Sequence, residues 1–345
     1  MTEVWTSNKG EWSEAYTFLR LLVNPLVSAA NDDLEAKPGK YYLVKGINVA
    51  IDSSEVTVRP MESKYALMDS AKGVTSDEIR SSLPQILNEI NSGERAFSIP
   101  IAQSIFERMG LNKFKAASSK KVDIELELPS LGGGQDAKLG FSIKSMLGSA
   151  STLFNASSTT NIRFSFTPSK VTPQEILGLK YHELRPFLQG EQISLEGFEL
   201  ETFKDNLEFF GSDFPEKLAQ IVLTAYLGSG TTTLTEAITL WSADNGGQIA
   251  ASKLTFQMKN FLRSTALGMR PGSPWQGDLE GYGGYLIVKP DGDLVCLHLE
   301  NDDDFRSYLL SHTKFDFPKS SLFSRSSIQG SELHFSVNFQ IRFIK

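Results

Sequence analysis

Two strand-like segments joined by a glycine-rich turn constrain the fold of this chain more than any other feature. The segments are VDIELEL and KLGFSIKS, and PSLGGGQDA lies between them. Apolar and polar residues alternate in the first segment, as expected for a strand with one buried face. Because glycine permits a tight reversal of the backbone, the stretch from Asp123 to Lys144 is predicted to form an antiparallel hairpin.

The hairpin brings Asp123 close to the end of its second strand. A turn centred on the last two glycines of the triplet places Asp123 opposite Lys144, and a shift of two residues places it opposite Ser142. Since side chains alternate along a strand, either register puts all three residues on one face of the sheet. Asp136 lies near the turn and is therefore the poorer partner for Lys144.

A carboxylate and a lysine on one face suit the hydrolysis of a phosphodiester bond. That reaction needs hard oxygen ligands for Mg²⁺, an activated water and a cation beside the developing negative charge. Asp123 is the predicted ligand, Lys144 is the predicted cation, and the backbone carbonyl of Ile143 can add a further oxygen ligand. The pattern alone also fits an exposed antiparallel pair of strands with polar outer residues.

The rest of the chain predicts a mixture of helices and strands. Asn8 and Glu11 resemble a helix capping box, and apolar residues follow at helical spacing up to Val23. Further helices are predicted over 76–90, 99–109, 214–227 and 250–267, and further strands around 40–51, 54–60, 285–289, 294–299 and 334–344. We therefore expect an α/β (α+β) core. We predict a single large domain over 1–345, with a catalytic core over about 8–170 and a recognition and C-terminal part over about 171–345.

Cysteine and histidine usage argues against several kinds of site. The single cysteine, Cys296, excludes a disulfide framework and a zinc site built on several thiolates. The four histidines do not cluster at metal-binding or triad spacings. Since no stretch approaches the roughly 18 apolar residues of a membrane span, and the N-terminus lacks the pattern of a signal peptide, we expect a soluble cytoplasmic protein.

Acidic residues are unevenly distributed, although the net charge is -7. They are absent from 137–174, 245–277 and 317–331, and they are frequent between Glu191 and Glu216. This distribution predicts one face that accepts a polyanion and an acidic opposite face, because Lys and Arg supply much of the affinity for nucleic acid. Chance clustering of surface charge is the alternative.

Several segments together indicate a family. The strand that ends in Ser142, Ile143 and Lys144, after a hairpin strand that opens on Asp123, resembles the PD-(D/E)xK nuclease core. The segments SIKSMLGSASTLFNASSTTN, FLRSTALGM, GGYLIVKPDGDLVCLHL and VNFQIRFIK resemble type II restriction endonucleases of the HpaII family. The similar segments extend from GEWSEAY to the last residue and so cover most of the chain.

This resemblance implies a central mixed sheet flanked by helices, with additional helical and β elements. It also implies Mg²⁺-dependent hydrolysis of double-stranded DNA at a short palindrome, CCGG, leaving 5'-phosphate ends. The chain would act as a homodimer or as a monomer that nicks successively, and a cognate DNA methyltransferase is expected in the host. Two further interpretations stay open, namely a structure-specific repair nuclease or junction resolvase, and a catalytically inactive DNA-binding protein.

Carried over by position, the resemblance makes Asp123 the first metal ligand and Lys144 the catalytic lysine. Ser142 departs from the family pattern, because it occupies the position of the second acid and cannot supply a carboxylate. The nuclease fold often contributes an acid from its N-terminal helix, which in this chain corresponds to Glu14. Glu125, on the same strand face as Asp123, is the second choice.

The stretches that lack acidic residues are also where DNA contacts are predicted. Asn and short polar groups recognise base edges, whereas Lys and Arg contact phosphates and guanine. The predicted DNA-binding residues are Ser145, Asn155, Asn161, Lys253, Lys259, Arg263, Lys319 and Arg325.

Overall fold

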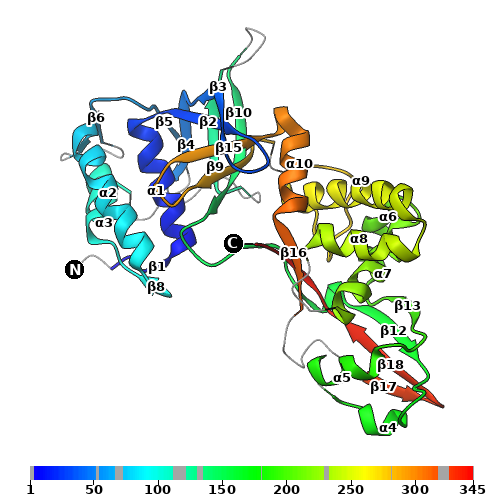
Figure 1. The fold of residues 1–345 in the computed structure, drawn as a ribbon. Coiled ribbons are helices and arrows are strands. Elements are labelled where there is room, and N and C mark those ends of the chain that lie inside the picture. Colours follow the sequence, from blue (N-terminus) through cyan, green and yellow to red (C-terminus); the bar gives the residue numbers. More distant parts are fainter. Residues whose placement is uncertain are drawn as a thin grey trace. The chain divides into compact units, whose positions relative to one another are not determined.

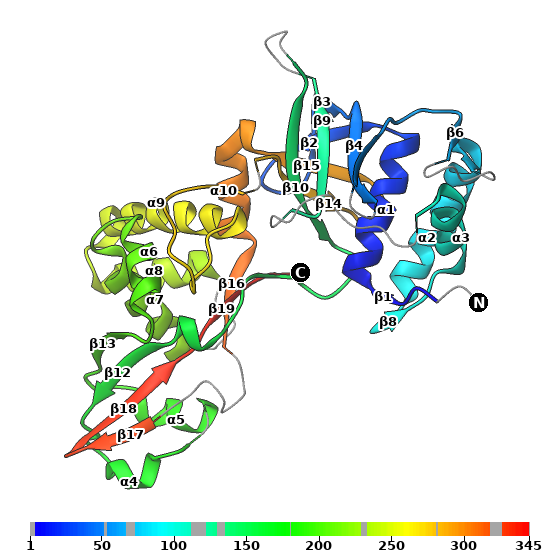
Figure 2. The same cartoon turned by 180° about the vertical axis from the view of Figure 1, so that it is seen from behind.

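The computed structural model describes two compact units. Unit 1 comprises Met1–Ser151 and Glu280–Phe305, and unit 2 comprises Thr152–Leu279 and Arg306–Lys345. Figures 1 and 2 show the elements of each unit from two sides. The described residues are 4–51, 54–66, 73–111, 122–129, 135–179, 181–228, 233–280, 282–317 and 326–344.

Unit 1 is built on an eight-stranded sheet with the order β3-β2-β15-β14-β10-β9-β4-β5. The sheet is mixed, because β10 runs parallel to β14 and β15 runs parallel to β2, whereas the other neighbours are antiparallel. Its strands are β2 (Leu26–Ala30), β3 (Ala36–Leu43), β4 (Gly46–Ile51), β5 (Ser54–Val58), β9 (Ile124–Leu128), β10 (Ala137–Ser145), β14 (Gly284–Val288) and β15 (Leu294–His298). The predicted hairpin is confirmed as β9 and β10.

Helices cover the sheet of unit 1. The predicted capping box of the first helix is confirmed, with the Asn8 side chain accepting from the Glu11 backbone N–H and the Glu11 side chain accepting from the Asn8 N–H. The helices are α1 (Lys9–Val23), α2 (Ser76–Ser92) and α3 (Pro100–Met109). Two pairs of short strands lie outside the main sheet: β1 (Ser7–Asn8) pairs with β8 (Ala96–Phe97), and β6 (Lys64–Tyr65) pairs with β7 (Val74–Thr75). The 3₁₀ turn η2 (Leu299–Asn301) leads into α10 (Asp302–Ser311), whose Phe305 packs edge-on against Tyr285.

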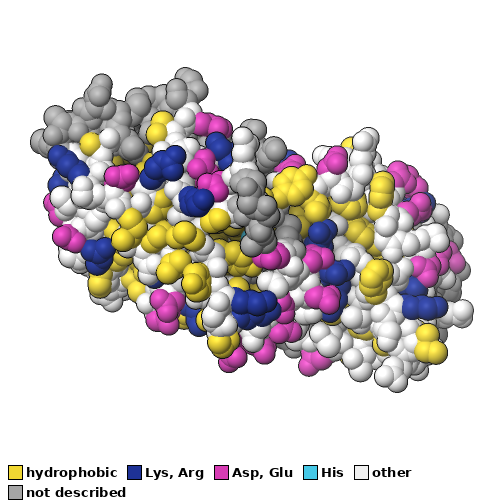
Figure 3. Space-filling view, turned by 90° about the horizontal axis from the view of Figure 1, so that it is seen from above, with side chains coloured by type: hydrophobic (Ala, Val, Ile, Leu, Met, Phe, Trp, Pro, Cys, Tyr) yellow, Lys and Arg dark blue, Asp and Glu magenta, His cyan; other side chains and the backbone are white. Residues whose placement is uncertain are grey.

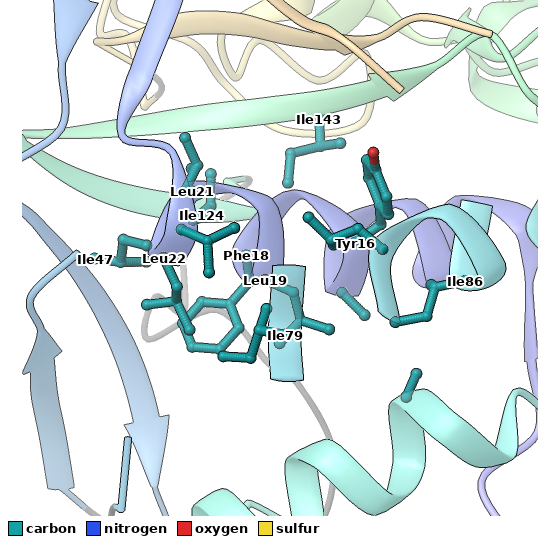
Figure 4. Packing of buried hydrophobic residues seen from close by; sticks show 14 of the residues in the cluster. Tyr16, Phe18, Leu19, Leu21, Leu22, Ile47, Ile79, Ile86, Ile124 and Ile143 are labelled. Carbon is teal, nitrogen blue, oxygen red and sulfur yellow. The ribbon is translucent and has the colours of Figure 1, made fainter. Parts of the chain in front are cut away.

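The core of unit 1 lies between this sheet and its helices. Figure 4 shows side chains of α1, among them Phe18 and Leu22, between Ile124 of the sheet and Ile79 of α2. Phe18, Leu22, Ile79 and Ile124 are fully buried. Each such side chain contributes roughly 1.5–3 kcal/mol by leaving water, so α1 is fixed by packing on both sides.

Unit 2 contains two smaller sheets and a group of helices. One sheet has the order β11-β19-β16 and the other has the order β13-β12-β18-β17. Its strands are β11 (Thr152–Phe154), β12 (Ile162–Phe166), β13 (Ser194–Phe198), β16 (Thr313–Asp316), β17 (Ser326–Gln329), β18 (Glu332–Val337) and β19 (Gln340–Phe343). Its helices are η1 (Ser158–Thr160), α4 (Pro173–Ile176), α5 (Tyr181–Leu188), α6 (Glu201–Glu208), α7 (Phe214–Leu227), α8 (Leu234–Asp244) and α9 (Gly247–Ala266).

This architecture confirms the predicted α/β (α+β) fold, and the mixed central sheet flanked by helices agrees with a PD-(D/E)xK core. Two of the strands in that sheet, β14 and β15, lie outside the range 8–170 that was predicted for the catalytic core. Among the described residues, no helix is long and apolar enough to cross a membrane.

Candidate active site

Asp123 lies where the two strands of the hairpin begin to separate. The last paired residues are Ile124 and Phe141, so the next position places Asp123 opposite Ser142, the second of the two registers predicted. The Asp123 N–H donates to the Phe141 carbonyl at 2.9 Å. Its carboxylate Oδ2 accepts from the Ile143 N–H at 2.7 Å, so backbone and side chain together fix its position beside β10.

The same contact orients the Ile143 carbonyl. The N–H and C=O of one residue in a strand point to the same side of that strand. Because the Ile143 N–H points to Asp123, the Ile143 carbonyl also faces the side on which Asp123 lies. A carboxylate and a carbonyl thus lie on one side of β10, as the sequence predicted for two oxygen ligands.

Lys144 interacts electrostatically with two carboxylates. Its Nζ is 5.0 Å from the centre of the Tyr285 ring on the neighbouring strand β14, within the range of a cation–π contact. Burial lowers the pKa of the Lys144 ammonium group, and the carboxylates of Asp123 and Glu14 oppose that shift through their negative charge. Glu14 of α1, Lys144 of β10 and Asp123, which directly precedes β9, therefore interact electrostatically at one place in unit 1.

A buried hydrogen bond connects α1 to β10 beside this group. The Ser13 and Ser145 hydroxyls lie 2.7 Å apart, and Ser13 is fully buried. Ser13 directly precedes Glu14, and Ser145 directly follows Lys144. The bond therefore restrains the helix that carries Glu14 against the strand that carries Lys144.

The other carboxylates of the hairpin are engaged elsewhere. Glu125 accepts from the Asn48 side-chain amide at 2.8 Å. Asp136 forms an ion pair with Lys45 at 2.8 Å, at the opposite end of β10 from Lys144. Asp123 and Glu14 are therefore the carboxylates that act on Lys144, and the Ser142 hydroxyl supplies no charge.

The donor set fits Mg²⁺. Two carboxylates and one backbone carbonyl are hard oxygen donors, and Mg²⁺ usually binds one or two carboxylates and keeps several waters. Within the described parts of the chain, no group of three or more His, Cys, Asp and Glu side chains could hold a metal.

The residues predicted for DNA contact at the end of β10 and after it have different surroundings. Ser145 bonds to Ser13 and accepts from the Leu147 N–H, so its hydroxyl supports the backbone. Asn155 is exposed. Asn161 is buried and its Oδ1 accepts from Asn338 at 2.6 Å, an arrangement that holds two chain segments together.

The predicted basic contacts on α9 also differ from one another. Lys253 is exposed, Arg263 is partly buried, and Lys259 donates to the Ser307 hydroxyl at 2.9 Å. On the face of the molecule in Figure 3, Lys and Arg side chains are interspersed with Asp and Glu. Lys319 and Arg325 lie outside the described residues.

Sequence reasoning missed two residues of this site, Tyr285 and Ser13. Tyr285 lies in an apolar strand and Ser13 lies within the apolar stripe of a helix, so both give the signal of ordinary core positions. Their contacts with Lys144 and Ser145 join residues far apart in the chain. Only the assembled sheet reveals them.

The family is decided by comparison with known proteins. A family model described as HpaII restriction endonuclease matches residues 8–343. The chain belongs to the HpaII restriction endonuclease family. A relative named Type II restriction enzyme HpaII, from Haemophilus parainfluenzae, is 33% identical, and the match covers all of both chains. No solved structure matches the chain. The predicted resemblance to the HpaII family is thus confirmed.

Proposed function

We propose that this member of the HpaII family is a Mg²⁺-dependent type II restriction endonuclease that hydrolyses double-stranded DNA at a short palindrome. The main support is the group formed by Asp123, Glu14 and Lys144 at the open end of the hairpin. The resemblance adds CCGG as the expected target and 5'-phosphates as the expected ends.

Asp123, Glu14 and the Ile143 carbonyl are the proposed Mg²⁺ ligands. When bound there, Mg²⁺ supplies the positive charge that activates a water and stabilises negative charge on the phosphate. Asp123 is already oriented by its bond from the Ile143 N–H, so little rearrangement of this ligand is needed. Glu14 takes the place of the acid that is missing at Ser142.

Lys144 is the proposed catalytic cation. Its ammonium group neutralises charge that develops on the scissile phosphate, and a pre-oriented cation in a partly buried site is effective because water screens it little. The Tyr285 ring lies against the ammonium group, and the two carboxylates favour its charged form.

We also propose a cytoplasmic enzyme that acts as a homodimer, with a cognate DNA methyltransferase in the host. A two-fold dimer matches the symmetry of a palindrome, because each subunit can place one site on one strand. The candidate site described here is a single set of residues within unit 1.

A plasmid digest tests the proposed function. Wild-type protein with Mg²⁺ should cut a sequenced plasmid into discrete fragments whose ends map to one palindrome and ligate without prior phosphorylation. EDTA should stop the reaction. Cutting confined to branched or damaged DNA, or DNA binding without any cutting, would contradict the proposal.

Alanine substitutions of two aspartates on the hairpin, Asp123 and Asp136, test the location of the metal site. Asp123→Ala should reduce the cleavage rate by more than about 100-fold, because a metal ligand is lost. Asp136→Ala removes only the exposed ion pair with Lys45 and should cleave like wild type. The reverse result would move the metal site toward the turn.

A further inference from the structure

The four-stranded sheet of unit 2 has one apolar face and one polar face. Ile162, Phe164 and Phe166 of β12 are buried, and Phe335 of β18 stacks on Phe164 at 5.7 Å. Because side chains alternate along a strand, Arg163 of β12 lies on the opposite face. The apolar face is filled by the core, which leaves the polar face available for a ligand.

A cleft of about 630 Å³ lies on this polar face. Its lining combines one guanidinium group, carboxylates, hydroxyls, an amide and an imidazole, mainly from β12, β13, β17 and β18. Residues that line it include Arg163, Glu196, Glu199, Ser327, Gln329 and His334.

Arg163 presents its guanidinium group without an internal partner. Its cross-strand neighbours are Gly197 on one side and Ser336 on the other, so no bulky side chain stands beside it. Arg163 is exposed, and no hydrogen bond or ion pair joins its side chain to any residue that the structure describes. Glu196, by contrast, is already engaged by His334.

Two of the acid-free stretches of the sequence meet at this cleft. Arg163 comes from the stretch 137–174, and Ser326, Ser327 and Gln329 come from the stretch 317–331. The two strands that carry them, β12 and β17, are both paired with β18. Polar segments that are far apart in the chain therefore line one surface.

The mixture of charges favours a base edge over a phosphate. A phosphate site gains from cations and is weakened by carboxylates, yet Glu196 and Glu199 line this cleft together with Arg163. Both kinds of group can read a G·C pair, because an arginine side chain donates to O6 and N7 of guanine while a carboxylate accepts from the cytosine amino group.

We propose that this cleft is a base-recognition site for duplex DNA and that Arg163 pairs with the major-groove edge of a guanine. The proposal rests on the proposed function. It gives unit 2 a role in selecting the target, whereas the candidate catalytic residues lie in unit 1.

Binding measurements on modified duplexes test the proposal. The probes are fluorescent duplexes that carry the site mapped by the plasmid digest, a duplex with that site scrambled, and duplexes with 7-deazaguanine at each guanine in turn. Fluorescence anisotropy is read with Ca²⁺ in place of Mg²⁺, to prevent cleavage. Wild-type protein should lose affinity at one guanine position, because 7-deazaguanine lacks the N7 acceptor.

Arg163→Ala should weaken binding to the mapped duplex by about 5- to 150-fold and leave the scrambled duplex unchanged. At the guanine that Arg163 contacts, 7-deazaguanine should cause no further loss in this variant. Arg163→Lys keeps the charge but lacks the paired N–H donors of the guanidinium group, and it should show the same loss of specificity. Lys170→Ala removes an exposed charge just beyond β12 and is the control, with little change on either duplex.

Equal losses on mapped and scrambled duplexes would identify Arg163 as a phosphate contact and overturn the proposal. Wild-type affinity in both Arg163 variants would overturn it as well. If wild-type protein cuts at discrete sites in either case, the proposed function stands and only this inference fails. Wild-type protein that neither cuts at discrete sites nor prefers any duplex would refute the proposed function itself.

Discussion

Asp123 continues the register of the hairpin at the position where the chemistry is proposed. Its N–H continues the pairing with β10 for one residue beyond Ile124, and its carboxylate then accepts from the Ile143 N–H. One residue thus ends the strand pairing, and its carboxylate, the proposed metal ligand, is oriented by β10. The sequence offered two registers, and the pairing of β9 with β10 shows which of them forms.

Whether Glu14 or Glu125 is the second carboxylate ligand of Mg²⁺ can be tested with one substitution at each position. Glu14→Gln should raise the Mg²⁺ concentration for half-maximal cleavage by about 10- to 100-fold, because a charged ligand becomes neutral. Glu125→Gln keeps an acceptor for Asn48 and should leave this concentration unchanged. The measurement is a Mg²⁺ titration of the initial cleavage rate, and a larger effect at Glu125 would reassign the ligand.

We expect Ser145 to affect Mg²⁺ binding indirectly, because its bond to Ser13 helps to position Glu14. Ser145→Ala removes the bond to Ser13 and should raise the Mg²⁺ requirement several-fold, without weakening DNA binding in Ca²⁺. In a Glu14→Gln background it should add little, because the two changes affect one ligand.

Thr17→Val is the control for that experiment. Its hydroxyl donates to the Ser13 carbonyl at 2.8 Å, and the residue is fully buried, but this hydrogen bond stays within α1 and does not reach β10. An equal shift in Mg²⁺ requirement from Thr17→Val would show a general effect of helix stability rather than positioning.

Among the elements, α2 begins with a capping box that also binds a neighbouring helix. The Thr75 N–H and hydroxyl donate to Glu78, and Arg108 of α3 donates to the same carboxylate at 2.8 Å. These bonds, with the Thr75 N–H contributing most, lower the pKa of Glu78 to about 2. The carboxylate therefore ties α2 to α3 only while it is ionised.

The pH dependence of stability follows from this shift. Because the folded pKa of Glu78 lies below its ordinary value of 4.5, its contribution is complete above that value and is lost as pH falls toward about 2. Glu78→Gln should lower the urea midpoint at pH 7, and the difference from wild type should vanish near pH 2. Glu94→Gln, at an exposed position beyond the end of α2, is the control. A difference that is constant with pH would contradict the assignment.

The elements predicted from periodicity agree with the structure where local signals were strong. The helix predicted over 214–227 is α7 (Phe214–Leu227), and the helix predicted over 250–267 corresponds to α9 (Gly247–Ala266). The apolar segment around 40–51 is instead divided between β3 and β4, which pair with β2 and β9 respectively. Between them the Val44 N–H donates to Pro25 and the Lys45 N–H donates to Glu127, so tertiary pairing decides where one strand ends.

At the scale of the whole molecule, the sheet of unit 1 is completed by a segment that follows most of unit 2. β14 pairs with β10, and β15 joins β14 to β2. Tyr285, which holds Lys144, belongs to that late segment. The candidate active site therefore requires both parts of the chain that form unit 1.

Cleavage of supercoiled plasmid tests the proposed homodimer. A dimer that cuts both strands in one binding event should yield linear DNA without accumulation of open circles. Mixing wild type with excess Lys144→Ala should then give nicked circles, because mixed dimers hold one competent site. A monomer would accumulate open circles even without the variant. Excess Lys144→Ala would then only slow cleavage, because it competes for the same DNA sites.

The sequence by itself determined the hairpin, the first helix with its cap, and the family. These features depend on periodicity, turn chemistry and local spacing, which are properties of short segments. The tertiary structure decided the register, the approach of Glu14, and the contacts of Tyr285 and Ser13. The register depends on which residues of β9 and β10 pair. The other contacts depend on packing between segments distant in the chain, and their free energy exists only once the sheet and α1 have assembled.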